Sequence, residues 1–214
     1  MAEPASRAQG STSLSETLTI PQDIYDAIVA HAREGKPEEI CGLLRGREGQ
    51  VTGIHRCQNV AANPITDYEV DPQALLLQFD WEDAGDSLIA IYHSHPADPA
   101  YPSASDAINA YYPDSVFLIC SLLDNEHPVV KGYWLREAPG AFDGAAARAS
   151  LPFYETRPGR WGFYVPADAL LPAPLLGLTR PDGLALYVVC EDEPSGETYT
   201  RAVLVEPVEL LVTS

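Results

Sequence analysis

The chain has 214 residues, of which 46% are hydrophobic, enough to bury one core and a small second unit. Its formal net charge is -18 at pH 7, which excludes nucleic acid and anionic membranes as main partners, because both require a basic face. We expect a partner with a basic patch instead.

The sequence favours a reduced, cytoplasmic protein. Residues 1–17 lack the apolar core of a secretory signal, and no apolar run approaches the length of a membrane span. The cysteines show no Cys-x-x-Cys spacing, so a second, structural zinc site is not expected; they are Cys41, Cys57, Cys120 and Cys190.

The first quarter of the chain predicts a tail, a helix and a hairpin. Residues 1–17 are rich in Ser, Ala, Thr and Glu, a composition typical of a flexible tail. A helical apolar stripe begins after Pro21 and ends near Gly35. Two strands follow, at residues 39–45 and 51–57, joined by a turn that contains two glycines.

Two adjacent acids, Glu38 and Glu39, stand at the start of this hairpin. Neighbouring side chains of a strand face opposite sides, so one acid enters the cleft and the other meets solvent. A carboxylate on an apolar strand face is costly unless something pairs with it. The strand register decides which of the two turns inward, and an exposed edge charge is the alternative reading of Glu39.

The middle of the chain carries the candidate metal ligands. After a helix expected at residues 71–81, an apolar strand at 88–95 ends in His93 and His95, which point to the same face. Asp106 lies at the start of a helix expected to reach residue 112. Two imidazoles and a carboxylate are three of the four ligands of a catalytic zinc site, which leaves one position for water.

The same aspartate has a second interpretation. Ser103 and Asp106 form a helix capping box, with Ser103 as the N-cap and Asp106 three residues later. Both interpretations can hold together, because the cap would orient the backbone while the carboxylate faces the metal.

The last 100 residues are rich in strand signals. Strands are expected at 115–122 and 129–136, followed by a linker at 138–160 with a short helix at 144–150. Residues 161–214 predict a small β-rich extension, with strands at 161–165, 184–190 and 199–205 and a turn at 193–196. No motif there carries chemistry. The extension could dock on the rest of the chain, contact a substrate or make a dimer.

The spacing His93-x-His95, seven residues, Ser103-x-x-Asp106 resembles the signature of the JAMM (MPN-plus) zinc metalloproteases. That family also has an upstream glutamate followed after two residues by a glycine, and Glu39 matches it here. The resemblance covers residues 18–137. It implies a mixed α/β fold, the MPN fold, in which helices flank a mixed sheet related to that of cytidine deaminases. Residues 18–137 would then be the catalytic domain.

The resemblance also implies the roles of the site residues. His93, His95 and Asp106 would hold one Zn²⁺ per chain, and Glu39 would be the general base for a zinc-activated water. The Ser103 hydroxyl would contact the oxyanion. The expected substrate is the peptide or isopeptide bond after the tail of a ubiquitin-like or sulfur-carrier protein. A non-catalytic MPN scaffold and a zinc-dependent amidase for a small molecule are the alternatives.

Overall fold

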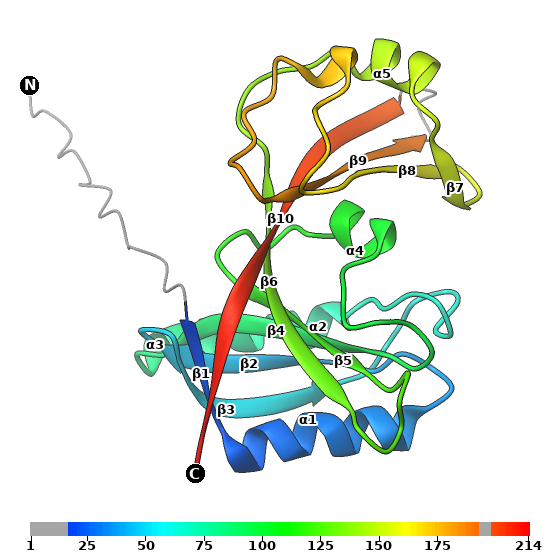
Figure 1. Ribbon diagram of the computed structural model, residues 1–214. Coiled ribbons are helices and arrows are strands. Elements are labelled where there is room, and N and C mark those ends of the chain that lie inside the picture. Colours follow the sequence, from blue (N-terminus) through cyan, green and yellow to red (C-terminus); the bar gives the residue numbers. More distant parts are fainter. Residues whose placement is uncertain (1–16, 193–197) are drawn as a thin grey trace, which may run out of the picture.

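A ten-stranded sheet dominates the computed structural model, which describes residues 17–192 and 198–214. The strands follow the order β1-β3-β2-β4-β5-β6-β10-β9-β8-β7, and β1 also pairs with β10. Figure 1 shows two lobes, with β10 running through both. The strands are β1 (Thr17–Pro21), β2 (Cys41–Arg47), β3 (Gln50–Cys57), β4 (Ser87–His95), β5 (Val116–Ser121), β6 (Val129–Glu137), β7 (Tyr154–Arg157), β8 (Arg160–Val165), β9 (Ala185–Asp192) and β10 (Thr198–Thr213).

Short helices cover the faces of the sheet. The longest, α1, packs on the lower lobe, and α4 lies between the two lobes (Figure 1). None of the described helices is long and apolar enough to cross a membrane. The helices are α1 (Gln22–Gly35), α2 (Pro72–Leu75), α3 (Leu77–Asp83), α4 (Ala104–Ile108) and α5 (Gly144–Ser150), with a 3-10 turn, η1 (Ala173–Leu175).

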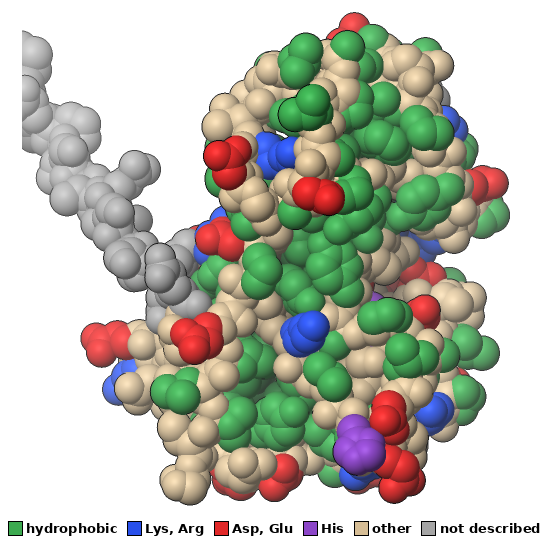
Figure 2. All heavy atoms as spheres, in the orientation of Figure 1, with side chains coloured by type: hydrophobic (Ala, Val, Ile, Leu, Met, Phe, Trp, Pro, Cys, Tyr) green, Lys and Arg blue, Asp and Glu red, His purple; other side chains and the backbone are tan. Residues whose placement is uncertain are grey.

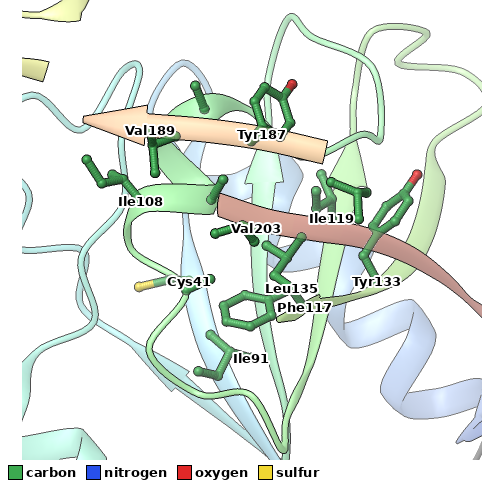
Figure 3. Packing of buried hydrophobic residues seen from close by; sticks show 14 of the residues in the cluster. Cys41, Ile91, Ile108, Phe117, Ile119, Tyr133, Leu135, Tyr187, Val189 and Val203 are labelled. Atoms are coloured by element: carbon green, nitrogen blue, oxygen red, sulfur yellow. The ribbon is translucent and has the colours of Figure 1, made fainter. Parts of the chain in front are cut away.

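The central strands of the lower lobe are buried on both faces. Along β5, Phe117 and Ile119 enter one core while Leu118 and Cys120 enter the other, since side chains alternate along a strand. The first core also receives Tyr187 from the upper lobe (Figure 3). A strand buried on both faces must be apolar throughout, which explains the continuous apolar runs in the sequence.

The upper lobe shares its core with the lower one. Tyr187 and Val189 of β9 and Val203 of β10 belong to the same buried cluster as Phe117 and Ile119 (Figure 3). The opposite face of β9 packs on a separate cluster that includes residues of α5 and η1. Residues 161–214 therefore continue the same sheet as the lower lobe, and the division of the chain into domains stays a prediction.

Several elements differ from expectation. The strand β1 was not predicted, because its five residues pair in parallel with the far end of β10, which local sequence cannot reveal. For the same reason β10 continues to Thr213, beyond the expected end at residue 205. A further strand, β7, lies inside the expected linker, where the short helix at 144–150 is confirmed as α5.

Two helices differ from expectation. The helix expected at 71–81 is divided at Leu76 into α2 and α3, and α3 continues to Asp83. The helix after Ser103 ends at Ile108, because Asn109 leaves helical geometry and Arg201 donates to carbonyl oxygens at this helix end. The tail was expected at residues 1–17, but Thr17 already belongs to β1. The rest of that tail and the turn expected at 193–196 lie outside the described residues.

Candidate metal centre and active site

Three candidate ligands converge where β4 meets α4. The Nε2 atoms of His93 and His95 lie 3.1 Å apart. The Asp106 carboxylate oxygens lie 3.2 Å from the His93 Nε2 and 3.5 Å from the His95 Nε2. All three side chains are buried. Among the described residues they form a group whose ligand atoms all lie within 4.8 Å of one another.

The capping box orients the aspartate. The Ser103 backbone N–H donates to the Asp106 Oδ2 at 2.7 Å, and the Asp106 N–H donates to the Ser103 Oγ at 3.1 Å. The two interpretations of Asp106 are thus compatible, because the carboxylate caps α4 and also faces the imidazoles. The Ser103 hydroxyl accepts in this box, which leaves its own hydrogen available to a ligand.

Each of the two imidazoles is oriented so that its Nε2 atom faces the other candidate ligands. The His95 Nδ1 donates to the carbonyl of Pro99 at 2.8 Å, which leaves the lone pair on Nε2. The His93 ring stacks on Tyr68, with centroids 4.1 Å apart and an interplanar angle of 16°. Its buried Nδ1 has no hydrogen-bond partner among the described residues.

The electrostatics of the group suit a cation. Burial lowers the pKa of His93, which favours the neutral imidazole that binds metals. Burial also opposes a charge on Asp106, but the two imidazoles outweigh it and hold its pKa well below the ordinary value. Burial lowers the pKa of His95, yet the Asp106 carboxylate raises it to about 9. A metal ion would take the place of the proton that this cluster otherwise shares.

Glu39 turns inward and Glu38 does not. The Glu39 residue is only 7% exposed, whereas Glu38 is exposed to solvent. Burial and the nearby Asp106 carboxylate raise the pKa of Glu39 to about 8, while His95 lowers it. A carboxyl group that titrates near neutral pH can accept and return a proton, although a cation nearby would favour its charged form.

Residues that sequence reasoning did not assign hold Glu39 in place. Asn59 Nδ2 donates to the Glu39 carbonyl at 2.8 Å, and the Glu39 N–H donates to the carbonyl of Pro64 at 2.7 Å. The Ser94 hydroxyl accepts from the Ile40 N–H at 3.0 Å. Because side chains alternate along a strand, Ser94 points to the face opposite the two imidazoles. Its position between His93 and His95 was the sequence feature that could have indicated this supporting role.

A cavity of about 430 Å³ opens beside the group. Glu39, His95 and Ser103 line it from the lower lobe. Tyr154 and Thr156 of β7 and Tyr187 of β9 are also in its lining. Both lobes therefore contribute to the space next to the candidate metal ligands.

The upper lobe also holds the segment that carries Ser103 and Asp106. The Tyr187 hydroxyl donates to the Pro102 carbonyl at 2.9 Å, one residue before Ser103. Arg201 donates to the carbonyls of Ile108 and Ala110 at 3.2 and 3.0 Å, at the end of α4. These contacts link β9 and β10 directly to the helix of the candidate ligand Asp106.

The approach of the two lobes requires a glycine on β8. A Cβ atom added to Gly162 would lie 2.6 Å from the Cβ of Ala104, the first residue of α4. Gly162 therefore lets the backbone of β8 lie directly against the helix.

Part of the chain is similar to known proteins. Residues 21–135 match the family model described as prokaryotic homologs of the JAB domain. A desampylase from Haloferax volcanii is 42% identical over 114 residues, which are 50% of this chain and 82% of that protein. A CysO-cysteine peptidase from Mycobacterium tuberculosis is 36% identical over 118 residues, 54% of this chain and 81% of that protein.

A solved structure of a protein from Desulfitobacterium hafniense is similar as well. It has a TM-score of 0.49 and 35% sequence identity, and the match covers 54% of this chain and 82% of that one. The family match spans the helix α1, the inward-facing Glu39 and the His93, His95 and Asp106 group. The chain belongs to the family of prokaryotic homologs of the JAB domain.

Proposed function

We propose that this protein is a zinc-dependent peptidase that hydrolyses the peptide or isopeptide bond after the tail of a ubiquitin-like or sulfur-carrier protein. Its named relatives are a desampylase and a CysO-cysteine peptidase. The observation that carries the proposal is the convergence of two imidazoles and a carboxylate, with an inward-facing glutamate in the adjoining cavity.

His93, His95 and Asp106 would hold one Zn²⁺ per chain. Two imidazole nitrogens and a carboxylate oxygen, with a further position left open, form the donor set of catalytic zinc sites. When bound, the ion lowers the pKa of water at the open position and draws electron density from a carbonyl oxygen. The hydrogen bond from His95 to Pro99 and the capping box around Asp106 orient two of the three ligands before any metal binds.

Glu39 would move the proton. Its carboxylate would accept a proton from the attacking water, and the same carboxyl group would return that proton to the leaving amine. Such positioned proton transfer contributes about 10²- to 10⁴-fold in rate. Hydrogen bonds of the Glu39 backbone with Asn59 and Pro64 hold this residue at the cavity. The residue is therefore already positioned before the reaction, and little conformational entropy is lost in reaching the transition state.

Ser103 would stabilise the charge that develops on the scissile carbonyl. Its hydroxyl lines the cavity, and its capping bonds hold its position. Removing one such donor typically costs about 10²- to 10³-fold in turnover.

We also propose a cytoplasmic location and a catalytic domain at residues 18–137. The four cysteines are buried and free, which suits a reducing compartment. The family match at residues 21–135 supports this domain boundary. In this scheme the later residues are an addition to the family domain.

The test is cleavage of a fusion in which a ubiquitin-like protein with a Gly-Gly tail precedes a reporter. The metal-loaded protein should release the reporter, and a chelator should stop the release. The Glu39→Gln variant should bind zinc and fail to cleave, while the matched control Glu38→Gln, altered at the exposed neighbour, should cleave normally. Full activity of Glu39→Gln would contradict the proposed role of Glu39.

The same assay separates the alternatives. A scaffold would bind the fusion without cleaving it, even with zinc present. An amidase would hydrolyse small amides and leave the fusion intact.

A further inference from the structure

The cavity beside the candidate metal ligands has a second wall that the family match does not include. Residues 21–135 account for Glu39, His95 and Ser103, whereas Tyr154, Thr156 and Tyr187 lie beyond that range. This second wall comes from the upper lobe, in the segment where sequence reasoning found no chemistry. Figure 2 shows the two lobes meeting at a waist.

The second wall is held at a defined place. Tyr187 is bonded through its hydroxyl to Pro102, next to Ser103, and Gly162 lets β8 lie against Ala104. Tyr101 and Tyr164 share a hydrogen bond of 2.8 Å across the same junction. With both sides of the cavity linked by hydrogen bonds and packing, a ligand that enters it would meet a preformed site.

The strand β7 contributes residues to this wall and is also the edge strand of the sheet. It is the last strand of the sheet and pairs with β8 alone among the described residues, so one of its edges offers free backbone groups. Tyr154 and Thr156 both line the cavity, although the pairing of β7 with β8 is irregular between Glu155 and Arg157. An extended peptide added to such an edge gains backbone hydrogen bonds, while alternate side chains provide specificity.

The charge of the cavity limits which peptide fits. Three carboxyl groups, those of Glu39, Asp67 and Asp98, line it together with the His95 imidazole, and its lining contains no Lys or Arg. Asp67 is engaged with Ser105, whose hydroxyl donates to it at 2.6 Å. An acidic segment would be repelled, and a neutral or basic one would be favoured.

We infer that β7 is the docking edge for the extended tail of the substrate protein, with Tyr154, Thr156 and Tyr187 contacting the residues that precede the scissile bond. The occupant is a neutral or basic tail, because it must reach Glu39 and Ser103 through a cavity lined by carboxylates. This inference rests on the proposed function and extends it, since the docking residues belong to a part of the chain outside the family match.

The test measures binding without cleavage. Zinc-loaded Glu39→Gln protein is titrated into a labelled peptide of about six residues that ends in Gly-Gly, which spans about 20 Å when extended. Adding Tyr154→Ala should weaken binding about 5- to 30-fold, the usual effect of losing an aromatic anchor. Tyr199→Ala is the matched control, since Tyr199 lies in the same lobe with 39% exposure, against 48% for Tyr154, and is not part of the cavity lining.

Equal binding by the Tyr154→Ala and Tyr199→Ala proteins, with zinc content and thermal stability unchanged, would overturn the inference. This outcome differs from failure of the proposed function, in which the wild-type protein binds the peptide through Tyr154 but cleaves no fusion.

A second arm tests the charge of the tail. A peptide with Arg before the Gly-Gly pair should bind more tightly than one with Glu at the same position. The Asp98→Asn substitution should reduce this difference in affinity between the two peptides. Tighter binding of the Glu peptide would contradict the assignment of a neutral or basic tail.

Discussion

Asn59 joins the candidate base Glu39 to the loop at residues 61–69, and its loss should lower both stability and turnover. The side chain makes four hydrogen bonds. Its Nδ2 donates to the carbonyls of Glu39 and Asp67 at 2.8 and 3.0 Å. Its Oδ1 accepts from the N–H groups of Ala61 and Glu69, each at 3.0 Å. Asn59→Ala removes all four bonds at once.

The size of the effect follows from these bonds. A hydrogen bond contributes a net 0.5 to 1.5 kcal/mol, and its orphaned partners cost more when they are buried. Here Ala61, Asp67 and Glu69 are half-buried or exposed and can bond water, whereas Glu39 is buried. We therefore expect a loss of about 2 to 4 kcal/mol in the free energy of unfolding. Turnover should also fall, because the Glu39 backbone would lose one of its holding contacts.

Urea unfolding and steady-state cleavage of the reporter fusion measure the two effects. Asn63→Ala is the matched control, since the Asn63 side chain donates one exposed hydrogen bond, to Thr66, within the same loop. Zinc affinity should change little in Asn59→Ala, because Asn59 contacts none of the candidate ligands. If the Asn59→Ala protein unfolds and turns over like the Asn63→Ala protein, the reasoning is refuted.

Three further predictions follow from the same structure. Removing zinc with a chelator should lower the melting temperature and abolish cleavage, with recovery on adding Zn²⁺; an unchanged melting temperature would argue against a metal at His93 and Asp106. Arg201→Leu should cost about 3 kcal/mol or more, since it removes two buried charge-assisted bonds at the end of α4. An Arg201→Leu protein of wild-type stability in urea would show that the end of α4 does not need this contact. Leu118→Ala should cost about 2 to 5 kcal/mol in the same measurement, because Leu118 is fully buried in the core beneath α1, and a smaller loss would mean that this core closes around the gap.

Local rules account for what could be predicted at the candidate site. The prediction that His93 and His95 share one face depends on strand alternation alone. The prediction for Asp106 depends on a helix capping box that spans four residues, from Ser103 to Asp106. Both patterns are complete within a few residues, so no distant contact was needed to recognise them. The helices α1 and α5 were predictable for the same reason, since their apolar spacing and end signals lie within the segment.

Tertiary contacts decided the rest. The sequence left open whether Glu38 or Glu39 turns inward, and the answer depends on hydrogen bonds from Asn59 and to Pro64, which other segments bring in. The sequence likewise could not show β1, whose partner in β10 is nearly 200 residues away.

By itself, then, the sequence determined the family, the candidate ligand triad and the mixed α/β class, because each is written in short local patterns. Only the tertiary structure placed Tyr154, Thr156 and Tyr187 beside Glu39 and Ser103. Their side chains meet the cavity because β10 pairs with β6 and carries the upper lobe onto the lower one, a pairing between residues that are far apart in the chain. Such long-range pairing depends on the packing of the whole sheet, which no local pattern encodes.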